Sequence, residues 1–111
     1  MEEALMEKAV EYLKRGDELK MSNRFQRAFE MYLNAMLAVG ALLVYSETGM
    51  LLGDSSLMRI LKDRFPDVFK IIDPYVSALP GYVELGIMRR DLLRLMAKVG
   101  MMNLPSSEEL G

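Results

Sequence analysis

The chain has 111 residues, of which 51% are hydrophobic and 27% are charged, with a formal net charge of −2. This length suits one domain with one core, and the composition excludes both a disordered chain and an uninterrupted apolar segment of the length that spans a bilayer. The absence of cysteine and histidine excludes disulfides, thiol nucleophiles, Ser-His triads and the usual zinc sites, so we expect no enzyme activity, no cofactor and no metal.

The first predicted element is an amphipathic helix over about residues 2–21. Its apolar side chains recur three or four residues apart, and charged residues fill the opposite side. The apolar positions are Leu5, Ala9, Tyr12, Leu13, Gly16 and Leu19. A glycine inside a helix costs about 1 kcal/mol relative to alanine. We therefore expect Gly16 to let a neighbouring helix approach closely.

A second, longer helix is predicted over residues 23–48, with Ser22 or Asn23 as its N-cap and Gly49 as its stop. Its second half is apolar on more than one side. This pattern is typical of the central helix of a bundle, or of a helix that partly faces another subunit. The candidate interface residues are Leu37, Ala41, Val44, Met101 and Met102.

The remaining pattern predicts a third, short helix after the capping residues Asp54, Ser55 and Ser56. Pro66 interrupts it and begins a second piece that ends at Ile72. A last helix is predicted over residues 82–99. The chain is therefore predicted to be all-α, an antiparallel, up-and-down four-helix bundle over residues 1–100 whose third helix is short or broken by proline. Residues 101–111 are predicted to be a flexible C-terminal tail.

Few residues in this sequence suggest a chemical site. Arg89, Arg90 and Arg94 are the candidate contact for an anion or a partner, because arginines four apart on a helix can clamp a phosphate or a carboxylate. The competing interpretation is a solvated helix face. Glu30 and Glu84 lie nearest the apolar stripes, and they are the carboxylates whose burial would be informative.

The first hairpin resembles one tetratricopeptide repeat. The resemblance covers about 30 residues. It rests on Tyr12, Gly16, Ala28, Tyr32 and Ala35, which fall at the packing positions of that repeat. It implies an adaptor hairpin, of the tetratricopeptide or MIT type, that binds a partner peptide.

The chain from about residue 4 to residue 99 is also similar to small prokaryotic HEPN domains. The similarity rests on the same hairpin, extended through Ala41 to Gly49 and followed by a short helix, a Pro-rich turn and a last helix. It implies a four-helix bundle that often dimerises. In active members, an RNase centre combines an arginine with a histidine in the last helix, with four to six residues between them. Arg89 and Arg90 lie in that region, but no histidine follows them, so the resemblance implies a non-catalytic relative.

Taken together, these patterns predict a non-catalytic, HEPN-like helical protein-interaction domain that forms a homodimer. A nucleotidyltransferase-like or other protein is a further expected partner. The adaptor hairpin is the first alternative, and a nucleic-acid-binding or nucleotide-binding protein that uses Arg89, Arg90 and Arg94 is the second. From the balanced charge and the acidic N-terminus we expect a cytoplasmic protein that contacts neither nucleic acid nor a membrane.

Overall fold

The computed structural model describes residues 1–100, and every regular element in that range is helical. In chain order these are α1 (Glu2–Met21), α2 (Phe25–Thr48), α3 (Asp54–Arg64), α4 (Pro66–Val76), the short 3-10 helix η1 (Pro80–Tyr82) and α5 (Leu85–Lys98). The predicted all-α class is confirmed.

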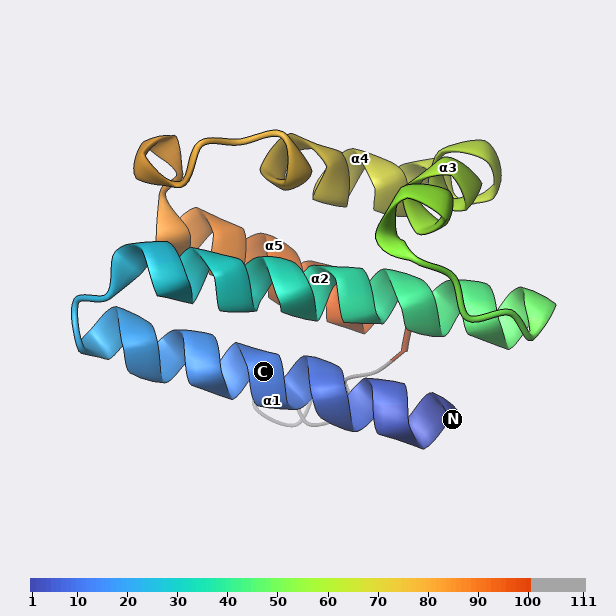
Figure 1. Cartoon of the computed structure of the whole chain (residues 1–111), viewed down its shortest axis with the longest axis horizontal. Coiled ribbons are helices and arrows are strands. Elements are labelled where there is room, and N and C mark those ends of the chain that lie inside the picture. Colours follow the sequence, from blue (N-terminus) through green and yellow to red (C-terminus); the bar gives the residue numbers. More distant parts are fainter. Residues whose placement is uncertain (101–111) are drawn as a thin grey trace, which may run out of the picture.

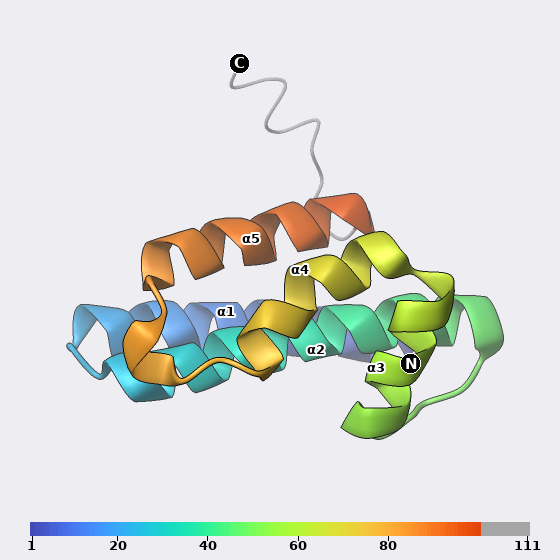
Figure 2. The same ribbon diagram turned by 90° about the horizontal axis from the view of Figure 1, so that it is seen from above.

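Helix α2 is the centre of the fold. It lies against every other helix, whereas the backbone of α1 comes close to α2 alone, and α1 meets α5 through the side chains of Asp17 and Arg89. Figure 1 shows α1 and α2 running antiparallel, with α3 and α4 in a layer above them. In Figure 2, seen from above, α5 runs along the far side of α4 and α2. This arrangement is compatible with a four-helix bundle.

The core is built around α2 because its apolar residues point in several directions. It supplies more buried residues than any other helix, among them Tyr32, Ala35, Met36 and Val39, each 0% exposed. Helix α5 adds Met88, Leu92, Leu95 and Met96. By length and composition α2 is also the one helix of residues 1–100 that is apolar enough to cross a membrane, but 56% of its most apolar window is buried inside the protein. This burial is typical of a core helix.

Several predicted helix ends are confirmed. Helix α2 ends at Thr48, and Gly49 adopts the left-handed conformation with φ 74°, which lets its N–H donate to the carbonyl of Tyr45. Pro66 separates α3 from α4 because a proline disfavours the helical conformation of its predecessor, and Phe65 has φ −133°.

Other predicted ends are wrong. Helix α2 begins after Arg24, without a side-chain cap, and Asn23 instead forms the left-handed link between α1 and α2 with φ 62°. Gly53, not Asp54, precedes α3, and it offers no side-chain cap. Helix α4 continues through Pro74 to Val76, beyond the predicted end at Ile72.

The last helix begins three residues later than predicted. Residues 80–82 form η1, and Glu84 is the N-cap of α5, where its side chain accepts hydrogen bonds from the backbone N–H groups of Gly86 and Ile87. These bonds lower the pKa of the Glu84 carboxyl because they favour its charged form. Both Glu84 and Glu30 are exposed. Neither of these two carboxylates is therefore buried.

Candidate functional site

The structure separates the three arginines of the candidate anion site. Arg89 faces α1, where its Nε donates to Oδ1 of Asp17 at 2.8 Å and its Nη2 donates to Oδ2 at 3.1 Å. Arg90 and Arg94 instead flank Asp91 on their own helix, with nitrogen-to-oxygen distances of 3.7 and 3.8 Å. Arg89 is therefore committed to a contact within the fold, and only Arg90 and Arg94 extend into solvent.

Asp17 is the meeting point of three helices. Besides its contacts with Arg89 of α5, it accepts a hydrogen bond of 2.6 Å from the hydroxyl of Tyr32 in α2. Partial burial raises the pKa of the Asp17 carboxyl, but the hydrogen bonds from Arg89 and Tyr32 outweigh that effect, and the net pKa is lowered. Burial and the same carboxylate raise the pKa of the Tyr32 hydroxyl.

Gly16 allows this cluster to form. A Cβ atom at position 16 would lie 2.6 Å from Cε1 of Tyr32, which is closer than real Cβ contacts come. The tyrosine ring therefore packs directly on the backbone of α1, and its hydroxyl reaches Asp17 one residue further on. The predicted close approach at Gly16 is confirmed.

A second tyrosine–aspartate pair joins α4 to α5. The Tyr75 hydroxyl donates to Asp91, the carboxylate that Arg90 and Arg94 flank. Burial, followed by this hydrogen bond, raises the pKa of Tyr75. Beside the pair is an open pocket of about 360 Å³ whose lining includes Lys70, Tyr75, Asp91 and Arg94. An anion that entered this pocket would compete with Asp91 for the arginine.

The predicted interface residues divide between core and surface. Leu37 and Ala41 are half-buried and line an open groove of about 280 Å³. Val44 is 1% exposed and belongs to the hydrophobic core, so its assignment to an interface is wrong. It lies on the side of α2 that packs inside the protein. Met101 and Met102 lie outside the described residues.

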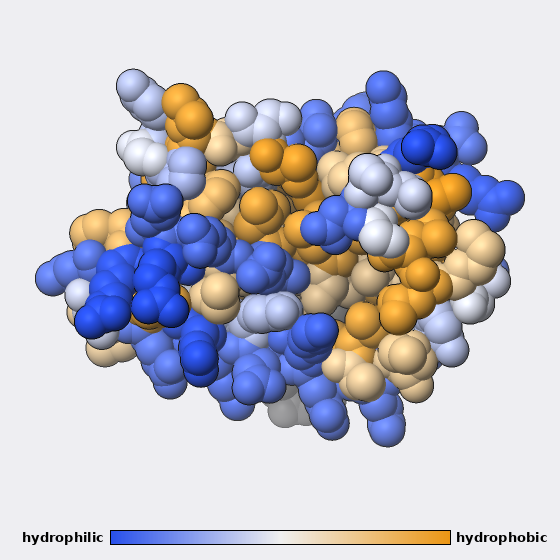
Figure 3. Space-filling view, in the orientation of Figure 1, coloured by the Kyte–Doolittle hydropathy of each residue, from blue (hydrophilic) through white to orange (hydrophobic). Residues whose placement is uncertain are grey.

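The groove runs along the second half of α2, between α1 and the start of α3. Its apolar lining includes Leu5, Tyr12, Leu37, Ala41 and Leu52. Two charged side chains also line it, Lys8 from α1 and Asp54 from α3. Figure 3 shows hydrophobic side chains gathered over this half of α2 and the segment that leads to α3, whereas α1 presents hydrophilic residues along its outer edge. We call this surface the α2 groove.

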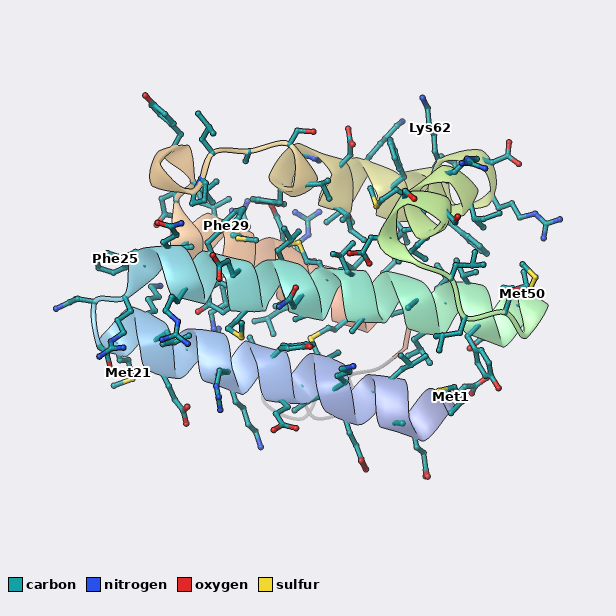
Figure 4. The ribbon with its side chains drawn as sticks, in the orientation of Figure 1. Met1, Met21, Phe25, Phe29, Met50 and Lys62 are labelled. Atoms are coloured by element: carbon teal, nitrogen blue, oxygen red, sulfur yellow. The ribbon has the colours of Figure 1, made fainter. Side chains whose placement is uncertain are left out.

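The largest exposed hydrophobic side chains gather at the two ends of the molecule. Met1, Met50 and Leu51 lie at one end, and Met21 and Phe25 lie at the other. Figure 4 shows Met1 with Met50 at one end of the α1–α2 hairpin and Met21 with Phe25 at its opposite end. The sequence analysis did not single out these exposed residues, because a single apolar residue near a turn is common on protein surfaces.

Sequence reasoning also missed Asp17 and Tyr32 as hydrogen-bond partners between helices, and Lys8 and Asp54 as lining residues of the α2 groove. A charged residue next to a packing glycine, as in Gly16-Asp17, was the available signal for the first of these. Among residues 1–100, no three acidic side chains lie close enough together to hold a metal ion. No family model, curated protein or solved structure matches this chain.

Proposed function

We propose that this protein is a non-catalytic helical interaction domain, similar to HEPN domains, and that it forms a homodimer through the α2 groove. The sequence supplies neither histidine nor cysteine, which removes the most common general bases and nucleophiles. The observation that carries the proposal is that Leu37 and Ala41 are half-exposed in a groove that polar side chains also line.

The exposed stripe of α2 changes character along its length. In the first half it carries Arg27, Glu30 and Asn34. In the second half, at the same helical spacing, the stripe carries Leu37 and Ala41. A helix that faces only water has no need of this change. The apolar half of the stripe therefore supports a contact with another protein surface.

The charges beside the groove favour a second copy of this chain as the occupant. Lys8 and Asp54 come from helices that lie on opposite sides of α2, and neither takes part in the ion pairs found among residues 1–100. Consider a dimer whose twofold axis lies in the plane of the interface, perpendicular to the line from Lys8 to Asp54. Rotation about this axis brings Lys8 of one copy to the position opposite Asp54 of the other. Each Lys8 then faces Asp54 of the partner, which is the self-complementarity that a twofold interface requires.

The first experiment measures mass in solution by size-exclusion chromatography with light scattering. We expect a dimer at tens of micromolar for the wild type and a monomer for Ala41→Glu, which places a charge in the centre of the groove. Gln26→Glu is the matched control because it adds the same charge to an exposed position of the same helix outside the groove. A wild-type protein that is strictly monomeric at this concentration contradicts the dimer.

A charge exchange tests the arrangement of the dimer. We expect Lys8→Glu and Asp54→Lys each to weaken dimerisation, because each places like charges opposite one another. The double variant restores the opposite-charge pairs and therefore the dimer. If the double variant loses as much dimer affinity as the two single variants lose together, the proposed axis is contradicted.

The α2 groove also favours one other candidate function, that of an adaptor that binds a helix from a partner protein. The groove is lined by both α1 and α2, as in the adaptor hairpin that the tetratricopeptide resemblance implies. A monomeric wild type that loses binding of a helical partner on the Ala41→Glu substitution would favour this candidate over the dimer.

A further inference from the structure

Exposed large hydrophobic residues occur around two connections at one end of the molecule and in the first turn of α5. Met21, 86% exposed, is the last residue of α1, and Phe25, 54% exposed, is the first residue of α2. The segment from α4 to α5 carries Leu79, 67% exposed, and Tyr82, 88% exposed. Ile87, in the first turn of α5, is 46% exposed. We call these five residues the hairpin-end patch.

The two segments lie at the same end in three dimensions. Figures 1 and 2 both show η1 and the start of α5 at the end where α1 turns into α2. The contacts agree with this arrangement, since η1 contacts α2 and the Arg89–Asp17 ion pair holds the first turns of α5 against the last turns of α1. The hairpin-end patch therefore brings two separate parts of the chain to one end of the molecule.

Positive charge borders this patch. From residue 20 to residue 27 the chain carries Lys20, Arg24 and Arg27 and no acidic residue. None of these three takes part in the ion pairs found among residues 1–100. In the second segment the one acidic side chain is Glu84, which is exposed and keeps its negative charge, because its hydrogen bonds to the start of α5 favour the charged form. Arg24 and Arg27, which are exposed and form no ion pair among residues 1–100, are the basic side chains available to an external anionic surface.

The shape of the patch distinguishes between possible occupants. A groove that receives a helix needs two apolar walls, but the pockets found among residues 1–100 are lined by other side chains. The most exposed side chains of the patch, Met21, Leu79 and Tyr82, instead lie at the end of α1 and in and beside η1. Exposed apolar side chains with an amphipathic tyrosine and flanking basic residues are suited to the boundary between lipid headgroups and acyl chains.

We propose that the hairpin-end patch inserts into the surface of an anionic lipid bilayer, with Met21, Leu79 and Tyr82 entering the interface and Arg24 and Arg27 facing the headgroups. This inference is independent of the α2 groove. It departs from the expectation of no membrane contact, which rested on chain-wide charge and hydropathy. The net charge and the hydropathy of the whole chain contain no information on where side chains lie, so they cannot show that five exposed apolar side chains lie at one end of the fold.

Co-sedimentation of the full chain with vesicles tests this proposal. The vesicles contain phosphatidylcholine alone or phosphatidylcholine with phosphatidylserine. We expect the wild type to bind the anionic vesicles and to bind the neutral ones at least about tenfold more weakly, because several basic side chains approach the surface. Added salt weakens the binding to anionic vesicles. Equal binding to both kinds of vesicle, or binding to neither, overturns the proposal.

Two variants separate the apolar from the basic contribution. The triple variant Met21→Ser, Leu79→Ser and Tyr82→Ser is expected to lower binding to anionic vesicles at least about tenfold. Arg24→Glu with Arg27→Glu is expected to abolish the preference for anionic lipid. The control, Met50→Ser with Leu51→Ser, removes exposed apolar residues at the opposite end and is expected to bind as the wild type does.

Circular dichroism and the mass in solution complete the test. All the substituted positions are exposed, so we expect each variant to keep the wild-type helix content. A folded triple variant that binds anionic vesicles as the wild type does overturns the proposal. Wild-type self-association that the triple variant loses, without binding of either kind of vesicle, would assign the patch to a protein contact and would also overturn it.

Discussion

Arg89 and Asp17, which are 72 residues apart in the sequence, form an ion pair with two hydrogen bonds between α5 and α1. The pair bridges α5 and α1, whose backbones do not come close to one another. Because the buried Tyr32 of α2 donates to the same carboxylate, one aspartate ties together the first, central and last helices.

Replacing Arg89 by alanine should destabilise the protein more than the same change at Arg90. Arg89 loses both hydrogen bonds to Asp17, and we expect the free energy of unfolding to fall by about 1–2 kcal/mol. Solvent screening keeps this loss modest, since about a third of each side chain is exposed. Replacing Arg90, which lies 3.7 Å from Asp91, by alanine should lower the free energy of unfolding by less than about 0.5 kcal/mol. Urea denaturation measures both, and equal losses would contradict the bridging role.

The contribution of Asp17 to the free energy of unfolding should decrease as the pH falls. The pKa of its carboxyl is lower in the folded protein than the usual 3.8, so the charged form is favoured by folding. Its stabilisation is therefore complete above the unfolded pKa and is lost as the pH falls through the folded pKa. We expect Asp17→Asn to be less stable than the wild type at neutral pH, with the difference shrinking below about pH 4. A difference that stays constant down to pH 2 would show that the charge is not responsible.

Gly16→Ala should destabilise the protein although alanine favours a helix. The added Cβ would lie 2.6 Å from the Tyr32 ring, which is held by its hydroxyl and by the core around it. We expect a net loss of about 1–3 kcal/mol, measured by thermal or urea unfolding. Gly81→Ala is the control, since a Cβ there meets nothing within 4 Å. A Gly16→Ala protein as stable as the wild type would mean that α1 and α2 can move apart with little loss of free energy.

Ala35→Glu should be the most damaging of these changes. Ala35 is 0% exposed, on the side of α2 that packs inside the protein, and a glutamate there would bury a charge without a partner. We expect the free energy of unfolding to fall by more than about 3 kcal/mol. Gln26→Glu places the same side chain on the exposed side of α2 and should be close to neutral. A folded Ala35→Glu protein with an unchanged melting temperature would show that the contact is not tightly packed.

Much of the helical framework follows from local pattern. Apolar residues at helical spacing predict α1 from residue 2 to residue 21, as observed. Gly49 ends α2 and Pro66 divides α3 from α4, because a residue without a Cβ and a residue without an N–H act on the backbone at their own positions. Such signals need no knowledge of the rest of the fold.

Other ends escaped prediction because distant contacts decide them. Pro74 is a local stop signal, yet α4 continues past it, where the next residue, Tyr75, is hydrogen-bonded to Asp91 of α5. Asn23 and Asp54 have the side chains of N-caps, but neither occupies the N-cap position of its helix. The cap that forms with a side chain, at Glu84, was assigned to the interior of the last helix.

The sequence by itself determined the all-helical class, the absence of imidazole and thiol chemistry, and the apolar character of α2, because each depends on residue types and on short-range spacing. Only the tertiary structure decided which apolar residues of α2 are buried, as Val44 is, and which line a groove, as Leu37 and Ala41 do. It also decided that Arg89 is bound to Asp17 while Arg90 and Arg94 face solvent. Helical periodicity defines the faces of a helix, but the neighbours that cover each face come from distant parts of the chain.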